Sequence, residues 1–355
     1  MMREERIVYF DHLRIFAAFL IMLLHAAAYK WNELDVGSLY WNILNVWKAL
    51  TDHAVLLYVM ISGALFLGRD IPIKKLYLKY ILRLLAAYII WTVAYCAYTD
   101  GSSGLWYFGF SLFYGHYHLW FLLMLICLYM CVPIFNAIIR SEKLLRYFLL
   151  LSFIFSFLLP TLFNLSDTFA PGWINACMKG LHDRMTEMHM YTVCGYSFFF
   201  LLGYYLNKEY SRAKRIQGRA EAIIYILGIL AIPVTAILSS VDSAASKTPS
   251  DIYHGNFNIA VLLTLTATFI FFMNHLSSVP KCMPASLPAR LSEYSFGAYL
   301  VHDFILLLLD RIFHLNAVSF FPLLAVPVIG IITFIISFAI SAGLNSIPFA
   351  KRFLV

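Results

Sequence analysis

The sequence predicts an all-α integral membrane protein, a bundle of ten transmembrane helices with both the N- and C-termini in the cytoplasm. Three observations indicate this fold class: an apolar composition, ten apolar runs of membrane-spanning length, and an uneven distribution of lysine and arginine between loops. Of the 355 residues, 62% are hydrophobic and only 13% are charged. Soluble domains have about 25% charged residues, so this composition excludes a soluble enzyme, a disordered chain and a small disulfide scaffold.

The ten candidate spans are apolar runs, because a helix needs about 20 residues to cross the hydrocarbon core of a bilayer. They cover approximately residues 8–29, 48–68, 80–98, 118–139, 147–163, 191–206, 221–240, 257–273, 294–313 and 320–344. The first span is expected to be retained, since Asp11 and Arg14 interrupt its apolar run and no small-residue cleavage site follows. We expect one membrane domain, residues 1–355, with no soluble domain.

The distribution of lysine and arginine orients the bundle, because loops rich in these residues stay in the cytoplasm. With the N-terminus inside, 19 of the 26 lysines and arginines fall on the cytoplasmic side and six fall on the other. A missed or extra helix would invert every later loop, so the asymmetry supports the number of spans. The basic residues are scattered over separate loops beside a membrane, which argues against a nucleic-acid partner despite the net charge of +7.

The first span carries the most informative ionisable residues: Asp11, Arg14 and His25. Charges inside hydrocarbon cost about 2.5 to 3.5 kcal/mol each, so those present usually face the bundle interior. Arg14 and His25 lie about 20° apart around a helix and roughly 16 Å apart along its axis, with Asp11 on the same stripe. This stripe could hold an anionic group at one end while a reaction occurs at the other. Alternatively, Asp11 and Arg14 simply pair near the inner interface, and His25 is a satisfied core histidine.

Other spans contribute further candidates without fixing their roles. His302 is expected to be buried in the span 294–313, with Tyr299 one helical turn earlier. His118 and Trp120 lie at the expected external boundary of the span 118–139, where imidazoles and amphipathic rings are common. Function and packing remain open for these residues. Ser62, beside Gly63, more readily indicates close helix packing than a nucleophile.

Two external loops, 99–117 and 164–190, are too short to be enzymes by themselves, so any chemistry is expected within the helices. The first is rich in rings and indicates either an aromatic belt at the interface or a stacking platform for a sugar. These rings are Trp106, Tyr107, Phe108, Phe110, Phe113, Tyr114 and Tyr117. In the second loop, His182, Asp183 and His189 match no metal-ligand spacing, and we predict no metal site.

Several motifs together resemble the membrane-bound acyltransferase-3 family, ten-helix proteins of bacteria. The resemblance rests on FDHLRIFAAFLIMLLH at residues 10–25, ISG at 61–63, HLWFLL from His118, YSFGAYLVH at 294–302 and NSIPFAKRFL at 345–354. It implies a multi-pass protein of the bacterial cell membrane that transfers an acyl group, usually acetyl, from cytoplasmic acyl-CoA to an extracytoplasmic or lipid-linked glycan. The family's basic cluster corresponds here to Lys75, Lys79 and Arg83.

The resemblance also implies roles for the residues. Coenzyme A, a substrate and not a resident cofactor, would place its phosphates near Arg14, Lys75, Lys79 and Arg83, with Ser62 beside the donor. His25 would act as general base on the acceptor hydroxyl, since imidazole titrates near neutral pH, and Asp11 would pair with Arg14. The partner of His25 must come from another helix, with His118 or Trp120 as candidates by depth.

Three alternatives remain open from the sequence. An acyl-histidine intermediate is compatible with the same residues. A related group joins this membrane unit to an amino-acid racemase, which makes a carrier for a small solute such as serine the main rival, although the paired broken helices of many carriers are not apparent. The third alternative is a structural subunit of an envelope complex.

Overall fold

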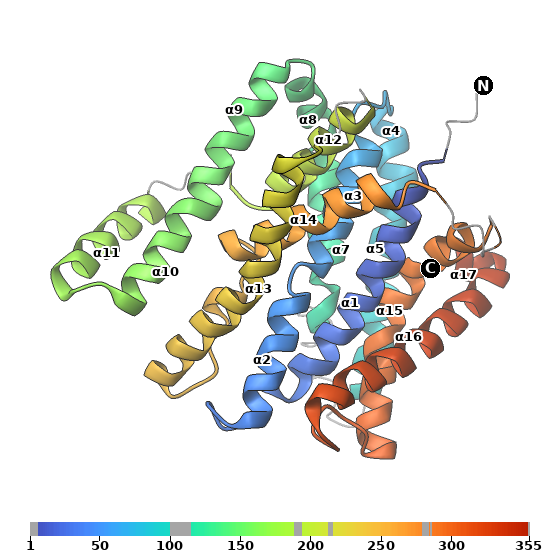
Figure 1. The fold of residues 1–355 in the computed structure, drawn as a ribbon. Coiled ribbons are helices and arrows are strands. Elements are labelled where there is room, and N and C mark those ends of the chain that lie inside the picture. Colours follow the sequence, from blue (N-terminus) through green and yellow to red (C-terminus); the bar gives the residue numbers. More distant parts are fainter. Residues whose placement is uncertain are drawn as a thin grey trace.

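The computed structural model describes residues 6–99, 115–187, 194–211, 216–278, 284 and 286–353. Across these ranges the chain is helical and contains no β-strand, so the all-α prediction is confirmed for the described part. Figure 1 shows long helices running side by side in a central bundle, with α9, α10 and α11 extending away on one side.

The helices follow one another with short connections. The first half contains α1 (Val8–Trp31), α2 (Leu39–Thr51), α3 (Ala54–Phe66), α4 (Ile73–Lys75), the π-helix η1 (Leu76–Ile81), α5 (Leu82–Thr99), η2 (Tyr117–Leu119), α7 (Trp120–Met130), α8 (Val132–Ile139), α9 (Glu142–Phe153), the π-helix η3 (Ile154–Leu158), α10 (Leu159–Phe169) and α11 (Gly172–Glu187). The second half contains α12 (Ser197–Ser211), α13 (Arg219–Ser246), η4 (Ile252–His254), α14 (Ile259–His275), α15 (Leu287–Phe313), α16 (Pro322–Ser346) and α17 (Pro348–Phe353).

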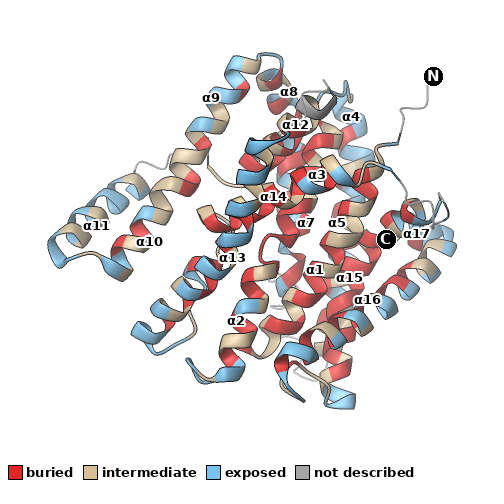
Figure 2. Ribbon diagram, viewed as in Figure 1, coloured by how far each residue is buried: buried red, intermediate tan, exposed pale blue. Residues whose placement is uncertain are grey.

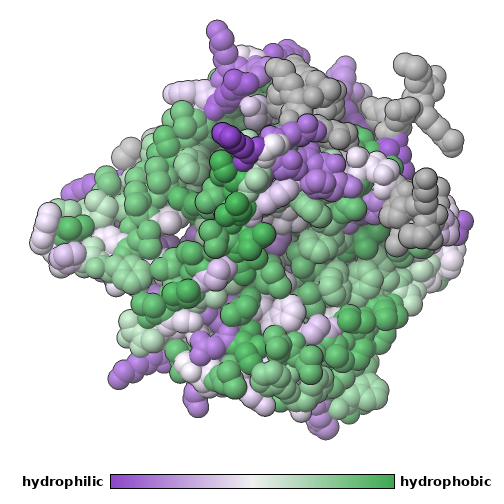
Figure 3. All heavy atoms as spheres, viewed as in Figure 1, coloured by the Kyte–Doolittle hydropathy of each residue, from purple (hydrophilic) through white to green (hydrophobic). Residues whose placement is uncertain are grey.

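Seven helical segments of the described ranges are long and apolar enough to cross a membrane, and a bent helix pair would make eight. Figure 3 agrees with this assignment, because apolar residues form a broad belt between hydrophilic residues gathered at the top and bottom of the view. The ten spans and the cytoplasmic termini stay predictions: α12 has only 15 residues, and α15 carries charged residues near both ends.

Two predictions about where helices and loops lie are wrong. The expected single helix over 118–139 is bent by 55° between Met130 and Val132. Pro133 follows this bend directly, in the first turn of α8, where its missing N–H costs no helical hydrogen bond. The expected loop over 164–190 contains the 16-residue helix α11.

The buried core surrounds α1, which contributes more than half of its residues to it. Figure 2 shows buried residues concentrated on α1, α3, α7 and α15, whereas α11 contains no buried residue. Helices α3 and α12 approach unusually closely, because a Cβ atom at Gly63 would lie 1.8 Å from the Phe200 carbonyl oxygen. The close packing predicted at Ser62–Gly63 is therefore confirmed for Gly63.

Candidate active site

The C-terminal half of α1 brings His25 into a cluster of rings from two other segments. The His25 imidazole lies 4.9 Å from the His302 ring, 5.4 Å from the Tyr117 ring and 6.5 Å from the His118 ring, measured between centroids. His302 comes from α15, whereas Tyr117 and His118 come from η2. The side chain of His25 therefore faces other helices of the bundle rather than lipid.

A hydrogen-bonded chain links His25 to a buried carboxylate. The Tyr117 hydroxyl donates to Oδ1 of Asp303 over 2.5 Å, and the same hydroxyl lies 2.9 Å from Nδ1 of His25. Since the hydroxyl proton is engaged by Asp303, the Tyr117 oxygen accepts from His25, and Nδ1 carries the imidazole proton. This tautomer leaves the lone pair on Nε2 of His25, the atom that a general base requires.

The hydrogen-bonded chain is exposed to solvent at its Tyr117 end and buried at its Asp303 end. The Tyr117 side chain is 55% exposed, whereas Asp303 and His302 are 0% exposed and His118 is 1% exposed. His25 itself is intermediate between the two groups. A molecule can therefore approach His25 from the Tyr117 side, while the carboxylate behind it stays away from solvent.

Backbone groups fix the orientation of the buried rings. Tyr299 donates a short hydrogen bond from its hydroxyl to the His118 carbonyl oxygen, and Nδ1 of His302 donates to the Tyr299 carbonyl oxygen over 2.5 Å. Tyr299 thus supports both histidines. Trp120 lies away from the two histidines. It is 39% exposed, and its ring lies 5.4 Å from the ring of Tyr196, in the loop that precedes α12.

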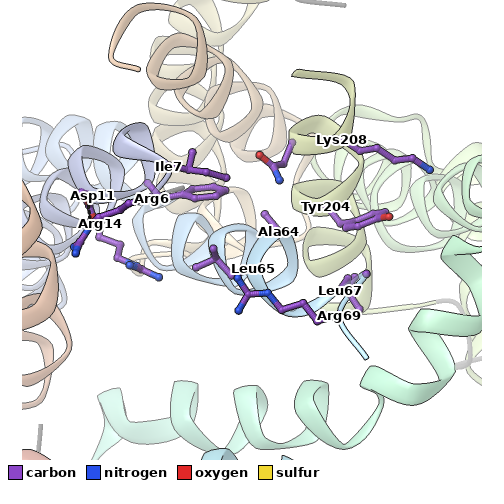
Figure 4. Close-up of a pocket in the computed structure, with 13 residues that line it drawn as sticks. Arg6, Ile7, Asp11, Arg14, Ala64, Leu65, Leu67, Arg69, Tyr204 and Lys208 are labelled. Carbon is purple, nitrogen blue, oxygen red and sulfur yellow. Dashed lines mark hydrogen bonds and ion pairs between the residues drawn. The ribbon is translucent and has the colours of Figure 1, made fainter. Parts of the chain in front are cut away.

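The opposite end of α1 borders a cationic cavity of about 780 Å³. Its lining includes four cations, Arg6, Arg14, Arg69 and Lys208, and the polar side chain of Asn207. Figure 4 shows that the cations come from the segment before α1 (Arg6), from α1 (Arg14), from the turn after α3 (Arg69) and from α12 (Lys208). A cavity with this lining suits a polyanion, because several guanidinium and ammonium groups can contact phosphate oxygens together.

The turn after α3 holds Arg69 on the cavity wall. Gly68 adopts a φ of +79°, a backbone conformation that favours glycine. The Asn136 side chain accepts from the Gly68 N–H over 3.0 Å and donates to the Arg69 carbonyl oxygen over 3.1 Å. A side chain of α8 therefore fixes the turn that carries this arginine.

The expected pairing of Asp11 with Arg14 is wrong. The Asp11 carboxylate accepts two hydrogen bonds from Arg6, over 2.6 and 3.0 Å, and this contact raises the pKa of the Arg6 guanidinium above its ordinary value. Arg14 instead donates to the Ser292 hydroxyl over 3.3 Å. Because Asp11 is neutralised by Arg6, the positive charge of Arg14 remains available to a ligand in the cavity.

The basic cluster after α3 is only partly on a cavity wall. Lys75 and Lys79 are exposed, and neither is among the described residues that line the cationic cavity or its neighbour. The neighbouring cavity, about 280 Å³, is lined by Arg83, Ser62 and Arg14 together with aromatic residues. Arg14 borders both cavities, so it stands where a ligand would pass from one to the other.

A ladder of rings continues from the second cavity to His25. Phe121 lines that cavity, and its ring lies 5.5 Å from Tyr299. The Tyr299 ring lies 5.6 Å from His302, which is the ring next to His25. Phe121, Tyr299 and His302 thus form a series of rings between the cavity and the His25 imidazole.

Sequence reasoning did not predict that Tyr117 and Asp303 lie beside His25, or that Arg69 lines the cationic cavity. Tyr117 stands next to His118 in the chain, and Asp303 stands next to His302, so adjacency to a candidate histidine was the available signal. Arg69 was visible only as one charge of a basic loop. The sugar-stacking platform expected at residues 106–114, and His189, lie outside the described residues.

Comparison with known families gives one match. A family model described as an acyltransferase domain, acyltransferase 3, matches residues 7–342. No curated protein and no solved structure was found to match the chain. The chain therefore belongs to the acyltransferase-3 family, which confirms the resemblance seen in its motifs, and it is a multi-pass membrane protein of an acyltransferase family.

Proposed function

We propose that the chain is an O-acyltransferase of the bacterial cell membrane that transfers an acyl group, acetyl in the simplest case, from cytoplasmic acyl-CoA to a hydroxyl of an extracytoplasmic or lipid-linked glycan. The observation that carries the proposal is the hydrogen-bonded chain His25–Tyr117–Asp303 on the helix that also carries Arg14. The reaction needs a general base for the acceptor hydroxyl and a binding site for the anionic donor. The His25 end of α1 offers the base, and the Arg14 end borders a cationic cavity.

The donor would bind with its phosphates in the cationic cavity. Arg6, Arg14, Arg69 and Lys208 line that cavity and supply positive charge. The pantetheine arm would pass Arg14 into the second cavity beside Ser62 and reach toward the external half of α1. This half lies roughly 16 Å from Arg14 along the helix axis, so the nucleotide need not cross the membrane.

In the chemical step, Nε2 of His25 would remove the proton of the acceptor hydroxyl as its oxygen attacks the carbonyl carbon of the thioester. The carbon–sulfur bond then breaks, and the protonated imidazole returns the proton to the thiolate of coenzyme A. General base catalysis of this kind contributes about 10²- to 10⁴-fold in rate. The products are an ester of the glycan and free coenzyme A, and no redox partner is needed.

Tyr117 and Asp303 would act as positioning residues in this reaction. Their hydrogen bonds keep the proton on Nδ1 of His25 and so direct the basic Nε2 away from Tyr117. The negative charge of Asp303 also stabilises the imidazolium that forms when His25 takes the acceptor proton. The exposed side of Tyr117 leaves room for the acceptor next to the base.

The test is a transfer assay with purified protein in vesicles, acetyl-CoA and an extract of bacterial envelope glycans. We expect the glycan to gain the mass of one acetyl group and coenzyme A to be released in equal amount. His25→Ala should lower the rate about 10³-fold, whereas His182→Ala, which changes an exposed histidine of α11, should not change it.

The assay also separates the proposal from its rival. Full activity of His25→Ala would reject the role of this residue as base. Uptake of labelled serine into the same vesicles, with no consumption of acetyl-CoA, would favour the carrier instead.

A further inference from the structure

A second group of ligand-bearing side chains lies behind the His25 chain. His116, His118 and Asp303 each offer a nitrogen or oxygen atom, and these three atoms lie within 4.8 Å of one another. His118 and Asp303 are 1% and 0% exposed, respectively. The group joins the start of η2 to the middle of α15, two segments that are distant in the sequence.

Two atoms of this group are buried without a hydrogen-bond partner in the described structure: Nε2 of His118 and Oδ2 of Asp303. Buried polar atoms are paired in the great majority of cases, because an unpaired one costs the free energy of its lost hydration. Nε2 of His116 comes only within 3.5 Å of Oδ2 of Asp303. A cation bound between Nε2 of His118 and Oδ2 of Asp303 would give both atoms the partner that they lack.

The two imidazoles of this group are in direct contact. Nδ1 of His116 lies 2.8 Å from Nδ1 of His118, so one of these two atoms carries a proton and the other accepts it with a lone pair. The His116 ring stacks on Tyr95 with centroids 4.2 Å apart, and the backbone of His118 is held by Tyr299. Rings fixed in this way lose little freedom when they bind an ion.

We propose that His116, His118 and Asp303 form a site for a divalent transition-metal ion of the Zn²⁺ type. Two imidazoles and one carboxylate are the ligand set of several three-ligand zinc sites, and imidazole suits zinc, copper and nickel better than magnesium or calcium. The dication would balance the charge of the buried Asp303 carboxylate. The proposal does not depend on acyl transfer, and it departs from the sequence prediction of no metal because the ligands are brought together only by the fold.

Asp303 also belongs to a second group, with His25 and His302, whose ligand atoms lie within the same 4.8 Å limit. The first group is favoured because Nε2 of His116 comes within 3.5 Å of Oδ2, the unpaired oxygen of Asp303. An ion on His116 and His118 would leave the hydrogen bond between Tyr117 and Oδ1 of Asp303 in place, since the unpaired oxygen is Oδ2.

The test measures metal content of the full-length purified protein. The protein is stripped with a chelator, incubated with Zn²⁺, desalted and analysed by inductively coupled plasma mass spectrometry, with no donor or acceptor present. We expect about one Zn²⁺ per chain for the unmodified protein and a loss to background for His116→Ala and for His118→Ala. His182→Ala is the matched control and should keep the ion. Size-exclusion profiles and thermal unfolding of the stripped proteins identify any variant that fails to fold.

Substitution by Co²⁺ gives a second readout, because the visible absorption of four-coordinate Co²⁺ reports its ligands. Tyr117→Phe, which leaves all three proposed ligands in place, should bind Co²⁺ with an unchanged spectrum. Absence of stoichiometric Zn²⁺ in the folded unmodified protein would overturn the proposal. Loss of the ion in His25→Ala and His302→Ala, with retention in His116→Ala, would place it in the other group and overturn it as well.

Discussion

The two ends of α1 differ in the way their polar groups are held. At the Arg14 end, four cations line an open cavity that a ligand can fill. At the His25 end, imidazoles, a phenol and a carboxyl group are fixed against one another by hydrogen bonds and ring contacts. The first arrangement tolerates variation in the bound molecule, because charge–charge attraction depends weakly on angle. The second arrangement suits proton transfer, because a proton moves only between groups held at hydrogen-bonding distance.

The difference indicates how the two regions should respond to substitution. Changes at the His25 end should act on the chemical step and lower kcat. Changes at the Arg14 end should act on donor binding and raise KM for acyl-CoA. Kinetic constants measured for matched variants at each end can therefore confirm or break the comparison.

The largest of these effects is expected for Tyr117→Phe. The substitution keeps the ring but removes the hydroxyl between His25 and Asp303, so the imidazole loses the partner that fixes its tautomer. We expect kcat to fall about 100-fold with little change in KM for the donor. Initial rates of coenzyme A release at several donor concentrations give both constants.

A suitable control for this variant is Tyr147→Phe, which removes a hydroxyl from a tyrosine that is 58% exposed on α9. It should leave both constants unchanged. If Tyr117→Phe raised KM and kept kcat, the residue would serve binding and the distinction between the two ends of α1 would fail.

A smaller effect is expected for Arg14→Ala. Arg14 borders both cavities and its charge is not neutralised by Asp11, so its loss should weaken donor binding. We expect KM for acetyl-CoA to rise about tenfold, equivalent to about 1.4 kcal/mol, with a smaller change in kcat. The effect should diminish at high salt, because ions screen the attraction between the arginine and the phosphates.

Arg146→Ala is the control for Arg14→Ala, since Arg146 is an exposed residue of α9 that pairs with Glu142 over 2.6 Å. Its donor KM should equal that of the unmodified protein. A tenfold loss of kcat without a change in KM for Arg14→Ala would show that the arginine acts on the chemical step instead.

The contribution of α1 to the site was predictable from the sequence because helical periodicity is local. Arg14 and His25 share a stripe whatever surrounds the helix. The partner of His25 was not predictable, since Tyr117 and Asp303 meet only when η2 packs against α15. His118 and His302 were found by their depth in apolar runs, but depth alone does not give the direction of a ring.

The expectations that proved wrong have specific physical causes. Asp11 was paired with Arg14 by helical spacing, yet Arg6 lies in the segment before α1, which folds back so that two N–H groups of Arg6 reach the carboxylate. The donor-binding role of Lys75 and Lys79 was inferred from the resemblance to the family's basic cluster and stays a prediction, although neither lysine lines the two cavities described above. Lys79 lies in the π-helix η1, whose wider turn changes the direction of its side chain from that in an α-helix. Lys75 ends the short helix α4, which has no buried residue.

The same segment supplies the smallest expected effect and the finest test of the comparison. Arg69 lines the cationic cavity, whereas Lys75, six residues later, is exposed outside the lining of both cavities. If cavity position decides donor binding, Arg69→Ala should raise KM for acetyl-CoA about threefold, as for a partly exposed ion pair of about 0.5 to 1 kcal/mol. Lys75→Ala should leave KM unchanged. Equal increases for the two variants would indicate that the donor senses only the total charge of the loop, and the cavity would then have no special part in its recognition.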